Sequence, residues 1–221
     1  MCSRYKYNPK EFADLKIRFS VERDLQLKPE YDLYPKQYAP VLVSTGDEFA
    51  LKLFRWWLTP FFFETEFTGY SMYNAKAETL TQKGSYKHLL GKRHCLVLAS
   101  GFYEPLGEPG KKVPMYFNLK SGDDFTFPGL WDTWKRPDGE LLHSFTLITT
   151  EPNDLVPPIH PRMPVILRGD DAVRWLSCKP DNVRECRDLL KPYTADAMQV
   201  REEAKAPTVK KAKPTQPDLF S

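Results

Sequence analysis

Residues 95–99 read Cys-Leu-Val-Leu-Ala, a continuous apolar run that ends at Ser100 and Gly101. A run of this length, bounded by turn-forming residues, is typical of a β-strand that is buried on both faces. Comparable segments follow at short intervals, separated by turns that contain glycine and proline. The sequence therefore predicts a strand at residues 95–99 and further strands at residues 113–119, 125–127, 129–134 and 142–149.

The same criteria, applied outward from this strand, predict three more strands, at residues 41–43, 49–57 and 165–167. Apolar residues at helical spacing, together with capping residues, predict helices at residues 8–19, 85–90, 171–176 and 181–190. Because these helices are inserted among many strands and do not alternate with them, we expect an α+β fold. Its core would be a curved or barrel-like mixed sheet, with inserted and peripheral helices.

Length and composition favour one globular domain followed by a tail. The chain has 221 residues, of which 41% are hydrophobic and 14% aromatic, which is enough for a sizeable core. The expected domain covers residues 1–200, and we expect it to be a monomer. Residues 201–221 are rich in Lys, Glu, Ala and Pro, with little to bury, which predicts a disordered tail.

The cysteines and the absence of long apolar runs indicate a cytoplasmic protein. No run approaches the roughly 18 apolar residues of a membrane span, and no signal-peptide pattern follows Met1. A chain of this length does not need disulfides, so we expect a reducing cytosol. Neither a metal nor a cofactor is expected, because no metal-ligand spacing joins the four cysteines, Cys2, Cys95, Cys178 and Cys186.

The net charge of +3 is small, so a nucleic-acid site would have to be a local patch. The tail holds five Lys or Arg against three Asp or Glu, which leaves a charge of +1 for residues 1–200. Residues 76–94 form such a patch, with five Lys or Arg and only one acidic residue, Glu78. A solvated surface strip explains the same pattern equally well.

The chain begins Met1-Cys2-Ser3-Arg4. Since an initiator methionine is usually removed before a small side chain, we expect Cys2 to become the N-terminal residue. Its α-amine, with an ordinary pKa of about 7.7–8.0, and its thiol, at about 8.5, would then be two neighbouring nucleophiles. Such an aminothiol attacks an aldehyde twice, forming first a Schiff base and then a thiazolidine ring. Taken alone, the stretch favours a simpler interpretation, an ordinary second residue.

Three internal stretches place reactive polar residues where turns are expected, at residues 73–79, 101–104 and 160–164. Each has a structural explanation when it is taken singly. Asn74 is a common turn former, Glu104 is a carboxylate at a strand end, and His160 is a loop histidine. No one of them identifies a site by itself.

Together with the N-terminus, these stretches resemble the SRAP (SOS response-associated peptidase) family, whose members cross-link to abasic sites in single-stranded DNA. The resemblance extends through most of residues 1–200. Its motifs are Met1-Cys2-Ser3-Arg4, Arg55-Trp56 with Pro60, Asn74-Ala75-Lys76-Ala77-Glu78-Thr79, Gly101-Phe102-Tyr103-Glu104, Gly129-Leu130-Trp131-Asp132, Thr149-Thr150 and His160-Pro161-Arg162-Met163-Pro164.

The resemblance implies four catalytic residues and an aldehyde substrate, the ring-opened sugar of an abasic site. Cys2 would supply both nucleophiles for a covalent thiazolidine that shields the site during the DNA damage response. Glu104 would act as acid and base, and His160 would shuttle the same protons. Asn74 would orient the opened sugar with its amide. A lyase side activity is implied as well, since a Schiff base allows elimination of the 3′ phosphate.

The resemblance also implies that Arg4, Lys76 and Arg162 hold the flanking phosphates, which positions a strand without reading its sequence. Two departures from the family pattern bear on this interface. Lys76 stands where the family usually has Arg, so it keeps the charge but loses the bidentate fork. Pro105 stands where the family usually has Trp, which puts stacking by that residue in doubt.

Two other functions remain open at this stage. An N-terminal thiol near His160 is also the arrangement of a cysteine peptidase, here one that removes its own leader. A non-covalent module for single-stranded DNA is the other alternative, carried by the patch at residues 76–94 and the aromatic residues 61–63. Replacing Cys2 with Ala separates them, because only the non-covalent module would be unaffected.

The C-terminal residues Gln216-Pro217-Asp218-Leu219-Phe220 depart from the polar composition of the tail. They resemble the short peptide by which bacterial repair proteins dock on the sliding clamp, in which Gln216, Leu219 and Phe220 would be the anchors. Pro217 replaces the Leu more usual after the Gln. Folding of Leu219 and Phe220 onto the domain surface is the competing explanation.

Overall fold

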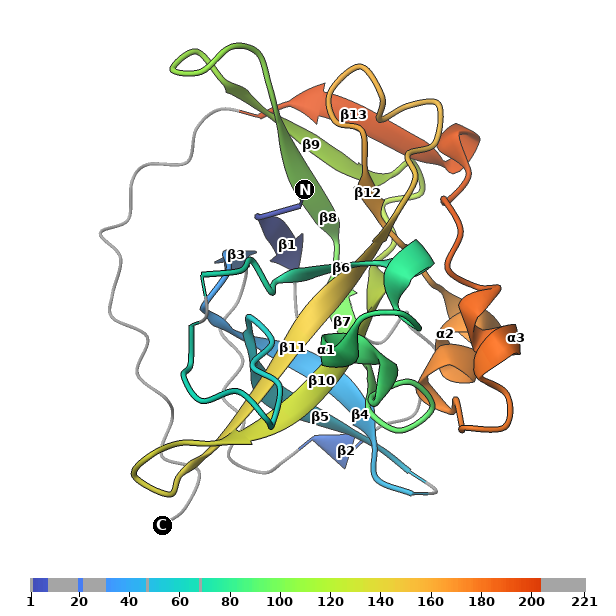
Figure 1. Ribbon diagram of the computed structural model, residues 1–221. Coiled ribbons are helices and arrows are strands. Elements are labelled where there is room, and N and C mark those ends of the chain that lie inside the picture. Colours follow the sequence, from blue (N-terminus) through green and yellow to red (C-terminus); the bar gives the residue numbers. More distant parts are fainter. Residues whose placement is uncertain (1, 8–19, 22–30, 47, 68, 204–221) are drawn as a thin grey trace.

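The computed structural model describes residues 2–7, 20–21, 31–46, 48–67 and 69–203 (Figure 1). One sheet contains β1 (Tyr5–Tyr7), β3 (Tyr31–Leu33), β8 (Gly101–Leu106), β9 (Val113–Leu119) and β13 (Met198–Glu202). The other contains β2 (Ser20–Val21), β4 (Tyr38–Ser44), β5 (Phe49–Trp56), β6 (Asn74–Lys76), β7 (His94–Ala99), β10 (Phe125–Lys135), β11 (Leu141–Thr150) and β12 (Met163–Pro164). The helices are η2 (Ala77–Thr79), α1 (Gly84–Lys87), α2 (Gly169–Leu176), α3 (Val183–Arg187) and η3 (Ala195–Ala197).

The larger sheet closes on itself. Its strands follow the order β12-β11-β10-β7-β4-β5-β2, and β5 also pairs in parallel with β11, which joins β11, β10, β7, β4 and β5 into a ring. The smaller sheet has the order β13-β9-β8-β1-β3. Figure 1 shows α2 and α3 together at one side of the ring, and β1, close to the start of the chain, beside β8. The expected α+β fold, a curved mixed sheet with inserted and peripheral helices, is confirmed, and the helices are few and short.

The apolar run at residues 95–99 lies in β7, the middle one of the five strands that form this ring. β7 has β10 on one side and β4 on the other, and each of its six residues is buried. Trp175 of α2 is fully buried and its indole N–H donates to the carbonyl of Cys95 at 3.1 Å. The continuous run of apolar residues is thus explained by cover on both faces of the strand.

Most of the predicted elements are present, with shifted ends. The strands expected at residues 41–43, 49–57, 95–99, 113–119 and 142–149 correspond to β4, β5, β7, β9 and β11. The helices expected at residues 85–90, 171–176 and 181–190 correspond to α1, α2 and α3, of which α1 and α3 are shorter than predicted. The predicted helix at residues 8–19 lies outside the described residues, as does the tail from residue 204.

The prediction of separate strands at residues 125–127 and 129–134 was wrong, since β10 runs through Pro128 without interruption. On one side β10 pairs with β7 along residues 125–130. On the other side the ladder to β11 begins only at Gly129, and the N–H of Thr126 donates to Leu167. Because N–H groups alternate in direction along a strand, the nitrogen of Pro128 faces the gap between these two partners.

Three further boundaries differ from the prediction. Residues 101–104 are not a turn, because β8 pairs with both β1 and β9. The strand expected at residues 165–167 is replaced by β12 at Met163–Pro164 and a single bridge between Leu167 and Thr126. The regular pattern also extends past residue 201, because β13 pairs with β9 as an edge strand that buries only Met198.

No described helix is long and apolar enough to cross a membrane.

Candidate active site

The start of the chain lies along the strand that carries Glu104. β1 runs antiparallel to β8, and the N–H of Tyr103 donates to the carbonyl of Arg4 at 2.9 Å. Because antiparallel strands keep their register, the residues before β1 continue along the second half of β8. The pairing therefore brings Cys2 toward Glu104, although 102 positions separate the two residues in the sequence.

Cys2 is enclosed, with 1% of its surface exposed. Its thiol donates weakly to the carbonyl of Arg4 at 3.5 Å, and its own carbonyl accepts from Nδ2 of Asn74 at 2.8 Å. Burial raises the pKa of the thiol above its ordinary value, and the charge of Glu104 raises it further. The thiol is therefore held protonated close to a carboxyl group that can take its proton.

Glu104 is the buried carboxyl group of this cluster, with 1% of its surface exposed. Burial raises its pKa from 4.5 to about 7, against the opposing effect of the positive charge at the N-terminus. Near neutral pH the group is divided between the acid and the carboxylate. This is the condition that suits a residue that both donates and accepts protons.

Asn74 occupies the first position of β6, which pairs in parallel with β11. Its side chain is buried, with Nδ2 on the carbonyl of Cys2. Its Oδ1 is also buried and has no hydrogen-bond partner among the described residues. Since an unpartnered buried amide oxygen is costly, this atom is suited to accept a hydrogen bond from a bound polar molecule beside Cys2.

Arg4 is engaged on two sides before any ligand arrives. Its Nη2 donates to Oδ2 of Asp32 in β3 at 2.6 Å, and its guanidinium carbon lies 3.8 Å from the ring centre of Tyr103. The Nε of Arg4 is buried without a hydrogen-bond partner among the described residues. A phosphate at Arg4 would therefore share the guanidinium with Asp32.

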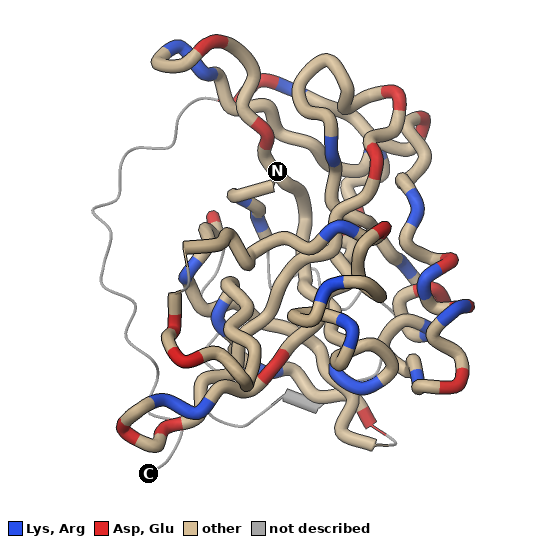
Figure 2. Tube along the Cα trace, viewed as in Figure 1, with Lys and Arg blue, Asp and Glu red and all other residues tan. Residues whose placement is uncertain are grey.

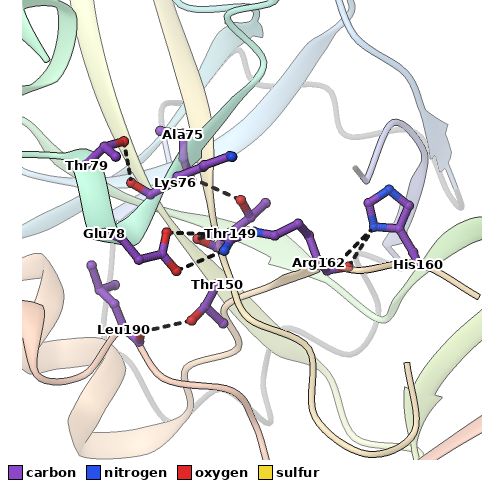
Figure 3. Close-up of polar contacts among 9 residues, drawn as sticks. All are labelled: Ala75, Lys76, Glu78, Thr79, Thr149, Thr150, His160, Arg162 and Leu190. Atoms are coloured by element: carbon purple, nitrogen blue, oxygen red, sulfur yellow. Dashed lines mark hydrogen bonds and ion pairs between the residues drawn. The ribbon is translucent and has the colours of Figure 1, made fainter. Parts of the chain in front are cut away.

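His160 lies in the segment that leads to β12, and its ring is held by Arg162 (Figure 3). The main-chain N–H of Arg162 donates to Nδ1 of His160 at 3.0 Å. Burial lowers the pKa of His160, and the hydrogen bond that Nδ1 of the protonated ring donates to the Arg162 carbonyl at 3.0 Å opposes this effect, but the charges of the N-terminus and of Arg162 lower the pKa further. Because the net shift is downward, the imidazole is mainly neutral at neutral pH.

The side chain of Arg162 is bound to Glu78 and to β11. Its Nη1 and Nη2 each donate to one carboxylate oxygen of Glu78 at 2.9 Å, and Nη2 also donates to the carbonyl of Thr149 at 2.8 Å. Lys76, the last residue of β6, is exposed. Burial raises the pKa of Glu78, but its hydrogen bonds and the charges of Arg162 and Lys76 lower it by more, so Glu78 is a carboxylate.

The structure brings the predicted site residues into one region with two parts. Cys2, Asn74 and Glu104 form a buried cluster, and Arg4 adjoins it through the first strand. The positive charge of the N-terminus lowers the pKa of both Glu104 and His160. The second part consists of Lys76, Glu78 and Arg162 around η2 and β11.

The surroundings of this region are mixed in charge, with Lys and Arg gathered around α1 and the turn before β7 (Figure 2). Within the described part of the chain, no group of three or more His, Cys, Asp or Glu is arranged to hold a metal. A pocket of about 400 Å³, lined by Lys92, Trp131 and Cys178 among others, contains none of the predicted site residues.

Sequence reasoning assigned no role to Asp32 or Glu78, the carboxylates that pair with the two predicted phosphate-binding arginines. Glu78 stands inside the motif at residues 74–79, where a charged residue four positions after Asn74 was the available signal. Asp32 lies 28 positions from Arg4, and only the pairing of β1 with β3 brings the two together. No local pattern in the sequence indicates that contact.

Comparisons with known proteins agree on one family. The model of the family described as SOS response associated peptidase (SRAP) matches residues 1–207. The abasic site processing protein YoqW of Bacillus subtilis is 37% identical over 203 residues, which cover 90% of each chain. The abasic site processing protein HMCES of Xenopus tropicalis is 33% identical over 196 residues, covering 75% of this chain and 58% of that protein. A crystal structure of a protein from Bordetella bronchiseptica superposes with a TM-score of 0.78 at 25% identity, covering 92% of this chain and 100% of the other.

Proposed function

Because this chain belongs to the SRAP family, we propose that it captures abasic sites in single-stranded DNA as a covalent thiazolidine at Cys2. Relatives that match over most of this chain are named abasic site processing proteins, and a ring-opened abasic sugar is an aldehyde. The observation that carries the proposal is the enclosure of Cys2 against Glu104 and Asn74. These residues place a thiol, a carboxyl group near its pKa and an unpartnered amide oxygen in one cluster.

The reaction begins once Met1 has been removed and the α-amine of Cys2 is free. The neutral amine adds to the aldehyde carbon, and Glu104 in its acid form protonates the departing oxygen, which leaves as water. The resulting Schiff base is attacked by Sγ at the same carbon, while the electron pair of the C=N bond moves onto nitrogen. The thiol proton passes to Glu104, now a carboxylate. The sum is an amine, a thiol and an aldehyde giving a thiazolidine and one water.

His160 and Asn74 assist these reaction steps. His160 is mainly neutral at neutral pH, so it can accept a proton from the reacting amine and return it. The buried Oδ1 of Asn74 accepts a hydrogen bond from a hydroxyl of the opened sugar. The Schiff base also permits a lyase side reaction, in which loss of the C2′ proton and departure of the 3′ phosphate cut the strand.

The flanking DNA contacts are assigned to Arg4, Lys76 and Arg162. Contacts of this kind hold a backbone without reading its sequence, so the lesion itself provides the specificity. Chemistry at the abasic carbon needs the sugar outside a base stack, and extrusion from a duplex costs a few kcal/mol. Single-stranded substrates should therefore react faster than fully paired ones, and equal rates on both would argue against a single-strand groove.

Intact-mass measurement after incubation with an abasic single-stranded oligonucleotide tests the proposal. The expected mass is that of the chain without Met1, plus the oligonucleotide, less one water. The matched control carries an uncleaved N-terminal tag, which converts the reactive amine into an amide and should abolish the adduct. A tagged protein that cross-links as well as the native one would rule out the aminothiol mechanism.

The Cys2→Ser variant separates the two nucleophiles. It keeps the amine but replaces the thiol with a much weaker nucleophile for ring closure. We expect a borohydride-trappable Schiff base and increased strand cleavage, with little adduct in the absence of borohydride. A stable adduct formed by the serine variant without reduction would show that the thiol is not needed.

A further inference from the structure

We propose that Glu78 is a positioning residue for His160, acting through Arg162. This inference rests on the proposed function, in which His160 moves protons at the abasic sugar. Glu78 and Arg162 are 84 positions apart in the sequence, and Figure 3 shows the carboxylate and the guanidinium facing one another. Nothing in the motif around Asn74 distinguishes Glu78 from an ordinary surface carboxylate until this pairing is seen.

The first link is the bidentate ion pair. Both oxygens of Glu78 accept from Arg162 at 2.9 Å, a fork-to-fork geometry that fixes orientation as well as distance. The side chain of Arg162 is only 15% exposed, whereas that of Glu78 is 43% exposed. The pair is therefore partly screened by water, and its role is better sought in geometry than in stability.

The second link ties the same guanidinium to the sheet. Nη2 of Arg162 donates to the carbonyl of Thr149 at 2.8 Å, near the end of β11. Thr149 in turn donates its hydroxyl to the carbonyl of Ala75 at 3.3 Å, in the strand that carries Asn74. Arg162 is thus fixed to the strand pair β6 and β11, from which the Asn74 side chain reaches Cys2.

The third link passes from the side chain of Arg162 to the ring of His160. The N–H of Arg162 lies 3.0 Å from Nδ1 of His160, so Nδ1 accepts this hydrogen bond when the neutral ring carries its proton on Nε2. When the ring is protonated, Nδ1 can donate to the Arg162 carbonyl, which also lies at 3.0 Å. The turn therefore supports both protonation states of the imidazole without moving, provided that Arg162 stays in place.

The pairing also bears on the DNA contact assigned to Arg162. In this structure the two terminal nitrogens of its guanidinium are used by Glu78 and Thr149. A phosphate that took over the fork would displace Glu78 and loosen the turn that holds His160. The phosphate contact assigned to Arg162 is therefore made at the edge of the ion pair, so that Glu78 continues to hold the guanidinium in place.

The test is the Glu78→Gln variant, whose amide keeps the shape but can accept through one oxygen only. Glu108→Gln is the matched control, since Glu108 is exposed and forms no salt bridge with another residue in the described part of the chain. The first readout is a ¹⁵N NMR titration of the His160 ring in the DNA-free protein. We expect the pKa of His160 and the balance between its two neutral tautomers to shift in Glu78→Gln, because the ring loses its fixed contact with the Arg162 backbone, with no change in the control.

The second readout is the cross-linking rate at saturating abasic oligonucleotide. We expect Glu78→Gln to slow it by about 5- to 50-fold, part of the 10²–10⁴-fold typical of general acid–base catalysis. Binding of undamaged single strands should stay within about twofold. Arg162→Lys should give the same His160 titration, and the double variant should be no slower than the slower single variant, as expected for residues that act as a unit.

An unchanged His160 titration in Glu78→Gln would overturn the inference, and so would a loss confined to DNA binding. Thermal unfolding of each variant distinguishes these outcomes from a failure to fold. If the wild-type protein forms no adduct, the proposed function fails, but the NMR comparison still decides whether Glu78 positions the histidine. The two conclusions are therefore tested separately.

Discussion

Glu104 is an unusual carboxyl group because folding favours its protonated form. Burial raises its pKa from 4.5 to about 7, so the folded state binds a proton more tightly than the unfolded state does. Its contribution to stability is complete below about pH 4.5 and is lost as the pH rises through about 7. The residue proposed to move protons at Cys2 is thus one whose ionisation opposes folding.

The Glu104→Gln variant should remove this pH dependence. The free energy of unfolding of the variant, relative to wild type, should rise between pH 4.5 and 7 by up to about 3 kcal/mol. Chemical denaturation at several pH values measures the difference. A difference that stays flat across this range would mean that the carboxyl group is not desolvated. Cross-linking should slow strongly, while binding to undamaged single strands changes by no more than a few-fold.

The cations proposed to bind DNA differ in how they are held. Arg4 is paired with Asp32 and Arg162 with Glu78, whereas Lys76 is exposed at the end of its strand. Pre-paired arginines lose less conformational entropy when they bind, but their carboxylate partners weaken the attraction for a phosphate. The family resemblance therefore suggested the phosphate contacts, and the fold determines how available each cation is.

At the scale of elements, β8 depends on Gly101 for its close approach to β9. A Cβ at this position would lie 2.3 Å from the ring of Tyr116, whose hydroxyl donates to the carbonyl of Ser100. Because the phenol ring is buried, it has little room to move aside. Overpacking of this kind typically costs about 1–3 kcal/mol.

Gly101→Ala should therefore destabilise the protein and misplace the strand that carries Glu104. We expect the melting temperature to fall by several degrees, at about 2–4 °C per kcal/mol for a domain of this size, and cross-linking to slow in parallel. Gly84→Ala is the control, since a Cβ added to this residue of α1 would have no atom within 4 Å. That variant should be neutral or slightly more stable. Equal behaviour of the two variants would show that β8 tolerates the added methyl group.

His94 links β7 to α2 and to the turn at Gly91, and its effect on stability has a pH dependence opposite to that of Glu104. Its Nε2 accepts from the N–H of Gly91 at 2.8 Å, and Nδ1 lies 3.0 Å from the carbonyl of Trp175 in α2. Burial lowers its pKa from 6.5 to about 4, against the opposing hydrogen bond to Trp175. The stability that it contributes is complete above about pH 6.5 and is lost as the pH falls through about 4.

His94→Gln should remove that loss. The free energy of unfolding of the variant, relative to that of wild type, should rise by up to about 3 kcal/mol as the pH falls from 6.5 to 4. In the wild type, the pH dependence of stability that comes from His94 and the one that comes from Glu104 have opposite signs. Their pH ranges overlap, so the two effects partly offset each other. The double variant His94→Gln/Glu104→Gln should therefore resemble wild type in slope more closely than either single variant does. If the two single variants changed the pH dependence of stability in the same direction, the pKa shifts assigned to His94 and Glu104 would both be contradicted.

The sequence predicts elements well where burial is on both faces and poorly where it is not. The apolar run of β7 needs no tertiary information, and β9 was predicted with its observed ends. By contrast, β1 and β3 have three residues each, and β13 buries only Met198, so none has a recognisable period. Pro128 interrupts the local pattern of β10 but not the strand, because the missing N–H faces a gap between partners.

The candidate site divides in the same way. Cys2, Asn74, Glu104 and His160 were identifiable because their motifs resemble those of a known family. Asp32 and Glu78 become visible only when strands and turns that are distant in the sequence are brought together. Reactive groups are therefore identified through their motifs, whereas the groups that hold them in place depend on long-range pairing.

At the scale of the whole molecule, the small net charge of +3 limits non-specific attraction to DNA. If Arg4, Lys76 and Arg162 contact one phosphate each, the logarithm of affinity for single strands should fall against the logarithm of salt concentration with a slope of about −2. Fluorescence anisotropy between about 50 and 200 mM salt measures this slope. A steeper slope that relaxes when Lys83 and Lys87 are replaced by Gln would bring the patch at residues 76–94 into the interface.

The last prediction concerns the C-terminal peptide, which lies outside the described residues. Leu219 and Phe220 are two large apolar side chains in a segment otherwise rich in Lys, Glu, Ala and Pro. Such a segment has little apolar surface of its own, which leaves these anchors for the pocket of a partner. Docking on a sliding clamp would raise the effective concentration of the domain near DNA without any new contact to the lesion.

A peptide covering residues 212–221 should bind a bacterial sliding clamp with a dissociation constant in the micromolar range, about −8 kcal/mol. Fluorescence anisotropy of the labelled peptide measures it. The doubly substituted peptide, Leu219→Ala and Phe220→Ala, is the matched control, because it keeps the charge, length and Gln216 but removes both anchors. Binding that survives this substitution would come from the rest of the peptide, such as Lys213, and not from a docking motif. No binding at high micromolar clamp would end the proposal, since a tethered contact weaker than that gains little from the effective concentration supplied by DNA.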